Sequence, residues 1–109
     1  MSIPPRIEQI KSMLKMEPED AFLNYALATE YVAIGRHQEA RSIFESLIDK
    51  KPDYVATYYH LGKLYETLHL RDNALKIYES GIETAQRIGD LHAKSELHEA
   101  LNDLLFEDD

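Results

Sequence analysis

The chain has 109 residues, which is enough for one domain, and its 44% of hydrophobic residues predicts a folded core rather than a disordered segment. Its 20 acidic residues outnumber its 12 basic ones and give a net charge of -8, so we expect neither nucleic acid nor an anionic membrane surface as a partner. The absence of cysteine excludes disulfide bonds and thiolate chemistry.

The sequence gives no indication of a membrane or secreted protein. No stretch has the length of uncharged apolar residues that a transmembrane helix requires. The first residues, MSIPPRIEQIK, lack the apolar core of a signal peptide. We therefore expect a cytoplasmic protein.

Apolar residues recur at intervals of three and four along the chain, which is the period of an α-helix, and no segment alternates as a strand would. The first helix is expected from about Pro4 to Met16. Pro18 ends it, because the residue before a proline avoids the helical conformation. The apolar stripe of this helix consists of Ile3, Ile7, Ile10 and Leu14.

Glycine and proline residues divide the rest of the chain into five more predicted helices. We expect these helices at about 20–34, 37–50, 54–68, 72–88 and 90–105. Gly35 ends the second helix, and Pro52 separates the third from the fourth. Gly89 and Asp90 end the fifth helix and cap the sixth. His69 stands at the turn equivalent to Gly35, and we expect it to adopt a positive φ, which histidine tolerates better than most residues.

The second and third predicted helices are repeated by the fourth and fifth at an offset of 34 residues. The identical pairs are Tyr25 and Tyr59, Leu27 and Leu61, Tyr31 and Tyr65, Ala40 and Ala74, Ile43 and Ile77, Glu45 and Glu79, Ser46 and Ser80, and Ile48 and Ile82. Side-chain size is kept elsewhere, since Ala28 corresponds to Gly62 and Phe44 to Tyr78. Two antiparallel helices approach closely only where a small residue lies at their crossing and a large ring fills the wider part. We therefore expect these positions to pack the two helices of each copy together.

The same residues carry a resemblance to a known family. The first copy contains Leu27-Ala28-x2-Tyr31, Ala40-x3-Phe44 and Pro52, and the second contains Leu61-Gly62-x2-Tyr65 and Ala74-x3-Tyr78. This pattern resembles the tetratricopeptide repeat (TPR), a helix pair with a period of 34 residues. The resemblance implies an all-α fold, an antiparallel helix-pair solenoid of about six helices. We expect one domain over residues 1–109, with a half repeat at 4–18, full repeats at 21–54 and 55–88, and a capping helix at 90–106.

The chain departs from the family pattern at three positions. Asn24 replaces the usual tryptophan, His69 replaces a turn glycine, and Gln86 replaces the proline of the second repeat. Without that proline, the sequence leaves the end of the fifth helix open.

The residues of the capping helix that are expected to face inward are Ala93, Leu97, Ala100, Leu101 and Leu104.

The resemblance also implies a binding function for the first helix of each repeat, because these helices line the concave groove in which TPR proteins bind a peptide or helix of a partner protein. The expected groove residues are Phe22, Tyr25, Thr29, Val32, Tyr59, Lys63 and Glu66. Their aromatic rings favour apolar or aromatic anchors on the partner. The sequence does not decide between this role and one in which Tyr25 and Tyr59 fill the seam between adjacent repeats. We expect a non-catalytic adaptor or scaffold.

A second hypothesis is self-association through the first helix, which has no partner half in the repeat pattern. Ile3, Ile7 and Met13 would then lie at the interface of a homodimer. The sequence contains no motif for catalysis, since the spacing of its histidines does not suit a metal site and its mid-helix serines have no adjacent base. We therefore expect no enzyme, no metal site and no cofactor.

Overall fold

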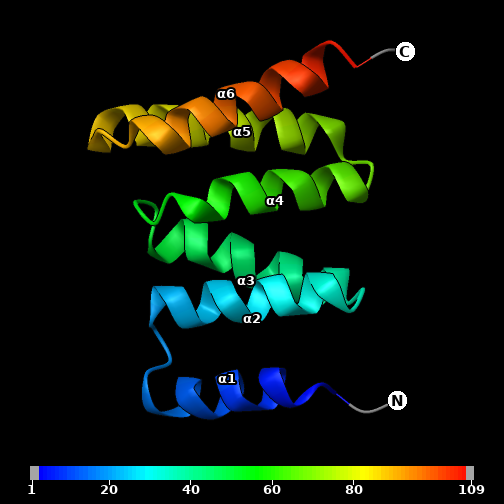
Figure 1. Ribbon diagram of the computed structural model, residues 1–109, viewed down its shortest axis with the longest axis vertical. Coiled ribbons are helices and arrows are strands. Elements are labelled where there is room, and N and C mark those ends of the chain that lie inside the picture. Colours follow the sequence, from blue (N-terminus) through cyan, green and yellow to red (C-terminus); the bar gives the residue numbers. More distant parts are fainter. Residues whose placement is uncertain (1–2, 108–109) are drawn as a thin grey trace. The chain divides into compact units, whose positions relative to one another are not determined.

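The structure of the protein is a computed structural model that describes residues 3–107, and it is built from six α-helices (Figure 1). The helices are α1 (Pro5–Met16), α2 (Ala21–Ala33), α3 (His37–Lys50), α4 (Ala56–Thr67), α5 (Arg71–Ile88) and α6 (Leu91–Leu105). Each end lies within about two residues of its predicted position, which is the usual uncertainty of a helix boundary. The predicted all-α class is confirmed, and no β-strand occurs in the described residues.

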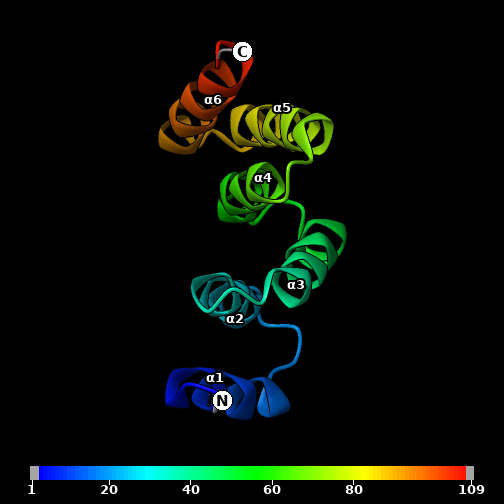
Figure 2. The same cartoon turned by 90° about the vertical axis from the view of Figure 1, so that its right-hand side faces the viewer.

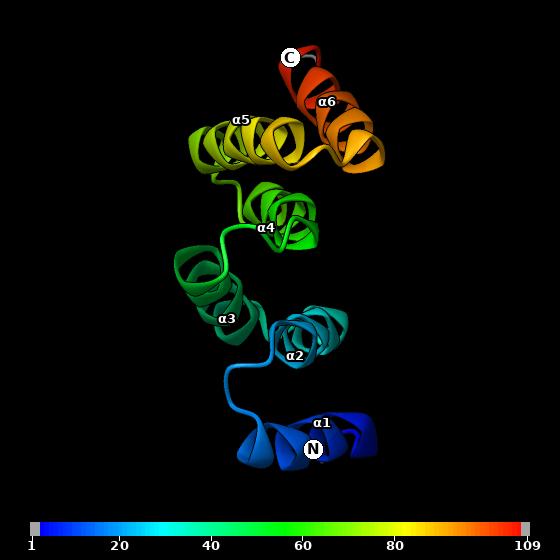
Figure 3. The same ribbon diagram turned by 90° about the vertical axis from the view of Figure 1, so that its left-hand side faces the viewer.

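Contacts between the helices divide the chain into two units, which we describe one at a time. The first unit ends at Lys51 and the second begins at Pro52. In the first unit, α2 lies between α1 and α3 and packs against both (Figure 2). In the second unit, α5 packs against α4 and α6, and α6 crosses α5 at an angle that also brings it against α4 (Figure 3). Each unit therefore contains three consecutive helices.

The helix ends follow from local residues. The carboxylate of Asp20 accepts a hydrogen bond from the backbone N–H of Leu23 at 2.8 Å and so caps α2, and Asp90 caps α6 through the N–H of Ala93 at 3.0 Å. Gly89 has a φ of 79° and ends α5 directly after Ile88, which settles the helix end that the sequence left open.

The turns after α2 and α4 use the same left-handed conformation with different residues. Gly35 has a φ of 80°, and His69, at the equivalent position of the second copy, has a φ of 62°. The predicted positive φ of His69 is thus confirmed. A residue with a Cβ is strained in this region, so the second turn is formed at a cost that glycine avoids.

The core of the first unit consists of the small and large side chains that the repeat keeps. Ala28, Ala40 and Phe44 are fully buried between α2 and α3. From the other side, α1 contributes Ile7 and Ile10 to its contact with α2. The exposed fraction of Ile7 is 0%, so the prediction that this side chain lies at a dimer interface is wrong. Ile7 belongs to the stripe that α1 buries against its own chain.

The core of the second unit depends on two glycines. A Cβ added at Gly62 would lie 2.1 Å from Cε1 of Tyr78, so α4 and α5 approach each other too closely there for any larger residue. A Cβ added at Gly81 would lie 2.6 Å from Cβ of Tyr58. Leu97 of α6 packs onto the same point of α5. Of the five residues predicted to face inward on α6, Leu97, Ala100 and Leu104 are buried, and Ala93 and Leu101 are half-buried.

Candidate functional site

The first candidate face lies on α2, where Phe22, Tyr25, Thr29 and Val32 follow one stripe of the helix. Phe22 is 60% exposed, and Val32 near the other end of the helix is also exposed. Tyr25 is half-buried, and the centre of its ring lies 6.4 Å from that of Phe44. The hydroxyl of Thr29 donates to the backbone oxygen of Ala26 at 2.9 Å. The apolar surface that α2 presents to solvent therefore centres on Phe22 and Val32.

The second candidate face lies on α4 and combines an aromatic ring with a cation. Nζ of Lys63 lies 5.7 Å from the centre of the Tyr59 ring, which is the geometry of a cation–π contact. The ring of His60 meets the same tyrosine edge-on at 5.5 Å. His60 is half-buried, and burial lowers the pKa of its imidazole. The α4 face thus offers the Tyr59 ring and the Lys63 ammonium group.

Glu66 has an internal role that the sequence did not reveal. The hydroxyl of Tyr78 donates to Oε2 of Glu66 at 2.5 Å, and Nζ of Lys63 lies 3.8 Å from the same oxygen. Burial of Tyr78, with a further contribution from its hydrogen bond to Glu66, raises the pKa of the phenol well above its usual value. One carboxylate oxygen of Glu66 is therefore already used to hold α5 on α4.

The residues of the proposed homodimer face lie in different environments. Ile3 is half-buried, Ile7 is buried, and Met13 is exposed. Met16, one turn further along α1, is 84% exposed. The apolar surface that α1 presents to solvent is therefore formed by Met13 and Met16.

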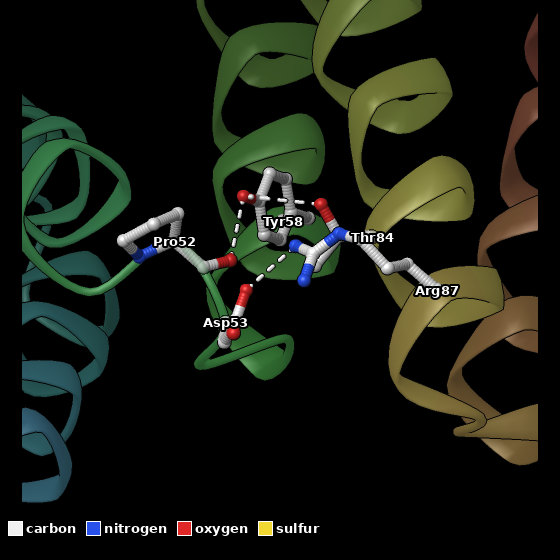
Figure 4. Close-up of polar contacts among 5 residues, drawn as sticks. All are labelled: Pro52, Asp53, Tyr58, Thr84 and Arg87. Atoms are coloured by element: carbon white, nitrogen blue, oxygen red, sulfur yellow. Dashed lines mark hydrogen bonds and ion pairs between the residues drawn. The ribbon is translucent and has the colours of Figure 1, made fainter.

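A polar network in the second unit was also missed by sequence reasoning (Figure 4). The hydroxyl of Tyr58 donates to the backbone oxygen of Pro52 at 2.8 Å and accepts from Thr84 at 3.5 Å. Nη2 of Arg87 lies 2.6 Å from Oδ1 of Asp53, and this hydrogen bond lowers the pKa of the Asp53 carboxyl. Both links join the segment before α4 to the end of α5. The first copy keeps the proline but has Asn24 in place of Tyr58, Lys50 in place of Thr84 and Asp53 in place of Arg87, so the comparison of the two copies gave no signal for this network.

The described part of the chain contains neither a metal site nor a membrane-spanning helix. Among residues 3–107, no three histidine or carboxylate side chains are grouped closely enough to hold a metal ion. Within the same range, every helix is too short or too polar to cross a bilayer.

Comparisons with known proteins agree on one family. The family model described as tetratricopeptide repeat matches residues 23–54 and 55–88. A TPR domain protein from Salinibacter ruber, solved by NMR, is 46% identical over 80% of this chain and 88% of its own, with a TM-score of 0.77. A protein from Bordetella parapertussis is 26% identical over 97% of this chain and 92% of its own, with a TM-score of 0.83.

A third structure shares the fold alone. The TPR2B domain of yeast Sti1, solved in a complex with pHsp70, is 17% identical over 94% of this chain and 82% of its own, with a TM-score of 0.85. No sequence among the curated proteins matches the chain. From the two matched repeats and the relative that is 46% identical, this chain belongs to the tetratricopeptide repeat family, whose fold is a protein–protein interaction module.

Proposed function

We propose that this protein is a non-catalytic interaction module that binds a peptide or helix of a partner protein through the exposed faces of α2 and α4, the residues for which the family resemblance predicts a concave groove. The observation that carries the proposal is Phe22, whose large apolar side chain is 60% exposed on the same stripe as Tyr25 and Val32. Aromatic anchors of this kind contribute most of the binding energy in many interfaces. A stripe along one helix suits an extended or helical segment.

The chemistry of the two faces indicates the class of partner. The α2 face is apolar and suits a segment with aliphatic or aromatic side chains. The Lys63 ammonium beside the Tyr59 ring on the α4 face suits a carboxylate or a carbonyl oxygen of a partner. The excess of acidic residues supports a protein rather than a nucleic acid as the partner. Because these faces are small, we expect a dissociation constant of about 10–100 µM for a single peptide.

The test is a selection of peptides from a displayed library on the wild-type protein, followed by affinity measurements on two variants. Phe22→Ser removes the exposed anchor, and Leu91→Ser removes an equally exposed apolar side chain from α6. We expect the affinity of selected peptides to fall about 10-fold or more for Phe22→Ser and to stay unchanged for Leu91→Ser. Peptides that bind Phe22→Ser as well as the wild type would contradict the proposal.

The two tyrosines need a different substitution. Tyr25 packs its ring near Phe44, so Tyr25→Ala should lower stability as well as binding. Tyr59→Leu keeps an apolar side chain and removes the cation–π contact with Lys63. A loss of affinity with an unchanged melting temperature in Tyr59→Leu would assign this tyrosine to binding, and a lower melting temperature would assign it to packing.

A second candidate function is self-association through α1. The observation that favours it is the exposure of Met13 and Met16 on a helix whose other side is buried against α2. The dimer surface would then differ from the predicted one, because Ile7 is not accessible.

A further inference from the structure

The net charge of -8 is unevenly distributed along the chain. Residues 1–51 contain seven basic and eight acidic residues, whereas residues 52–109 contain five basic and twelve acidic ones. The imbalance is largest at residues 90–109, which hold seven acidic residues and one basic residue. Residues 3–16, by contrast, hold three basic residues and one acidic residue. The helices α6 and α1 therefore lie in segments of opposite net charge.

The exposed side of α6 combines apolar residues with acidic ones. Leu91 is 70% exposed, and Phe106, directly after the helix, is 82% exposed. Between these apolar residues, Glu99 and Asp103 are exposed. They are four residues apart, so they lie one above the other on the same side of the helix. This side borders the buried side of the helix, which Leu97, Ala100 and Leu104 form.

The exposed side of α1 has the complementary character. Met13 and Met16 supply apolar surface on one flank of α1, and Lys11 and Lys15 are exposed on the other flank. The two lysines are also four residues apart and so lie on one side of α1. The third basic residue, Arg6, is 2.8 Å from Glu30 of α2 and is already paired. The basic edge of α1 is therefore formed by the two lysines.

We propose that α6 of one molecule binds α1 of a second copy, so that the protein associates head to tail. Lys11 and Lys15 would lie against Glu99 and Asp103. The spacing of the lysine pair equals that of the carboxylate pair, so both pairs can be matched at once.

The charges also determine which copies pair. Contact between the lysine flanks of two α1 helices would bring lysines against lysines, and contact between the carboxylate flanks of two α6 helices would bring carboxylates together, which is unfavourable in both cases. Pairing of unlike faces leaves one α1 and one α6 available at the ends of every assembly. Association of this kind continues beyond a dimer unless the copies close into a ring.

The contact is expected to be weak and sensitive to salt. One helix against another is smaller than the roughly 800 Å² that each partner buries in a stable complex, so we expect association only above about 0.1 mM protein. The ion pairs lie at the surface and are screened, so raising the salt from about 0.05 M to about 0.5 M should shift the protein towards monomer. This inference uses residues outside the proposed peptide-binding faces and does not depend on them.

The test measures the solution mass by sedimentation equilibrium over a range of concentrations, with charge-reversed variants. One variant carries Lys11→Glu and Lys15→Glu, and the other carries Glu99→Lys and Asp103→Lys. We expect the wild type to exceed its monomer mass of 12.6 kDa with rising concentration, and each variant alone to remain monomeric. An equimolar mixture of the two variants should associate again, because their reversed faces are complementary.

A control variant with Lys50→Glu and Lys51→Glu has the same net charge as the α1 variant but alters α3 and the residue after it, and it should associate like the wild type. Phe22→Ser should also associate normally, which separates this inference from the proposed peptide binding.

A monomeric wild type at every concentration would overturn the inference. Normal association of either charge-reversed variant, or a mixture that stays monomeric, would overturn it as well. Circular dichroism establishes that each variant is folded, and Lys15→Ser and Asp103→Asn replace any variant that is not.

Discussion

Single residues determine how closely the helices of each repeat approach. At the 34-residue offset, Asn24 corresponds to Tyr58 and Leu47 to Gly81. In the second repeat, the large Tyr58 lies directly over Gly81, whereas in the first repeat the small Asn24 and the large Leu47 line the same cleft. The large and the small side chain have thus exchanged places between two facing positions. Each repeat keeps close packing with a different pair.

The contact between Gly62 and Tyr78 gives the first prediction. In Gly62→Ala the new Cβ would collide with the Tyr78 ring, at a cost of about 1–3 kcal/mol for overpacking. Alanine favours the helix by about 1 kcal/mol, so we expect a net loss of up to about 2 kcal/mol in the free energy of unfolding. Denaturant titration measures it.

The control for this prediction copies the first repeat, where Ala28 occurs together with Phe44. Tyr78→Phe frees the ring from Glu66, so Gly62→Ala should cost less when it is added to Tyr78→Phe than when it is added to the wild type. If Gly62→Ala instead stabilised the protein, helix propensity alone would govern this position. The claim that α4 and α5 approach too closely at Gly62 for a larger residue would then be contradicted.

The hydrogen bond from Tyr78 to Glu66 predicts a dependence on pH. The folded state raises the pKa of Tyr78 above its ordinary value near 10, so folding favours the protonated phenol. This contribution is fully present below about pH 10 and is lost as the pH rises above it, because the unfolded chain then releases the proton more easily. Tyr78→Phe should cost about 1–2 kcal/mol at pH 7 and reduce the fall in stability above pH 10. Denaturant unfolding of the wild type and of Tyr78→Phe at pH 7 and above pH 10 measures this difference. If the stability of Tyr78→Phe fell as steeply above pH 10 as that of the wild type, the proposed role of the Tyr78 proton would be contradicted.

At the scale of helices, the left-handed turn residues decide how cheaply a helix ends. His69 has the positive φ that glycine adopts without strain, so His69→Gly should raise the free energy of unfolding by about 0.5–1 kcal/mol. The reverse change at the equivalent turn, Gly35→His, should lower it by a similar amount of about 1 kcal/mol. The midpoint of denaturant unfolding measures both. A destabilised His69→Gly would mean that the imidazole makes contacts worth more than the strain.

The helices themselves could be predicted from sequence because their signals are local. The three-and-four period, the prolines and Gly89 place each end within a few residues, and the 34-residue offset identifies the packing positions. The bond from Tyr78 to Glu66 could not be predicted, because it depends on which rotamers two helices adopt when they pack. Ile7 shows a related difficulty. The same pattern placed it both on the buried stripe and on a dimer face, and only its contact with α2 decides between them.

At the scale of the whole molecule, the proposed faces are distributed over different helices. The residues proposed to hold a peptide belong to α2 and α4, and those proposed to join copies belong to α1 and α6. A partner peptide and a second copy would therefore not compete for the same side chains. The protein could bind its partner as a monomer or as an assembly.

The account is tested most directly by an NMR titration of the labelled protein with a peptide selected on the wild type. We predict that the chemical-shift changes concentrate on the exposed residues of α2 and α4, with Phe22, Tyr59 and Lys63 among the largest. Phe22→Ser should abolish them at the same peptide concentration, and Leu91→Ser should not. Changes confined to α1 or α6, or the absence of any saturable change, would contradict the assignment of α2 and α4 as the binding faces.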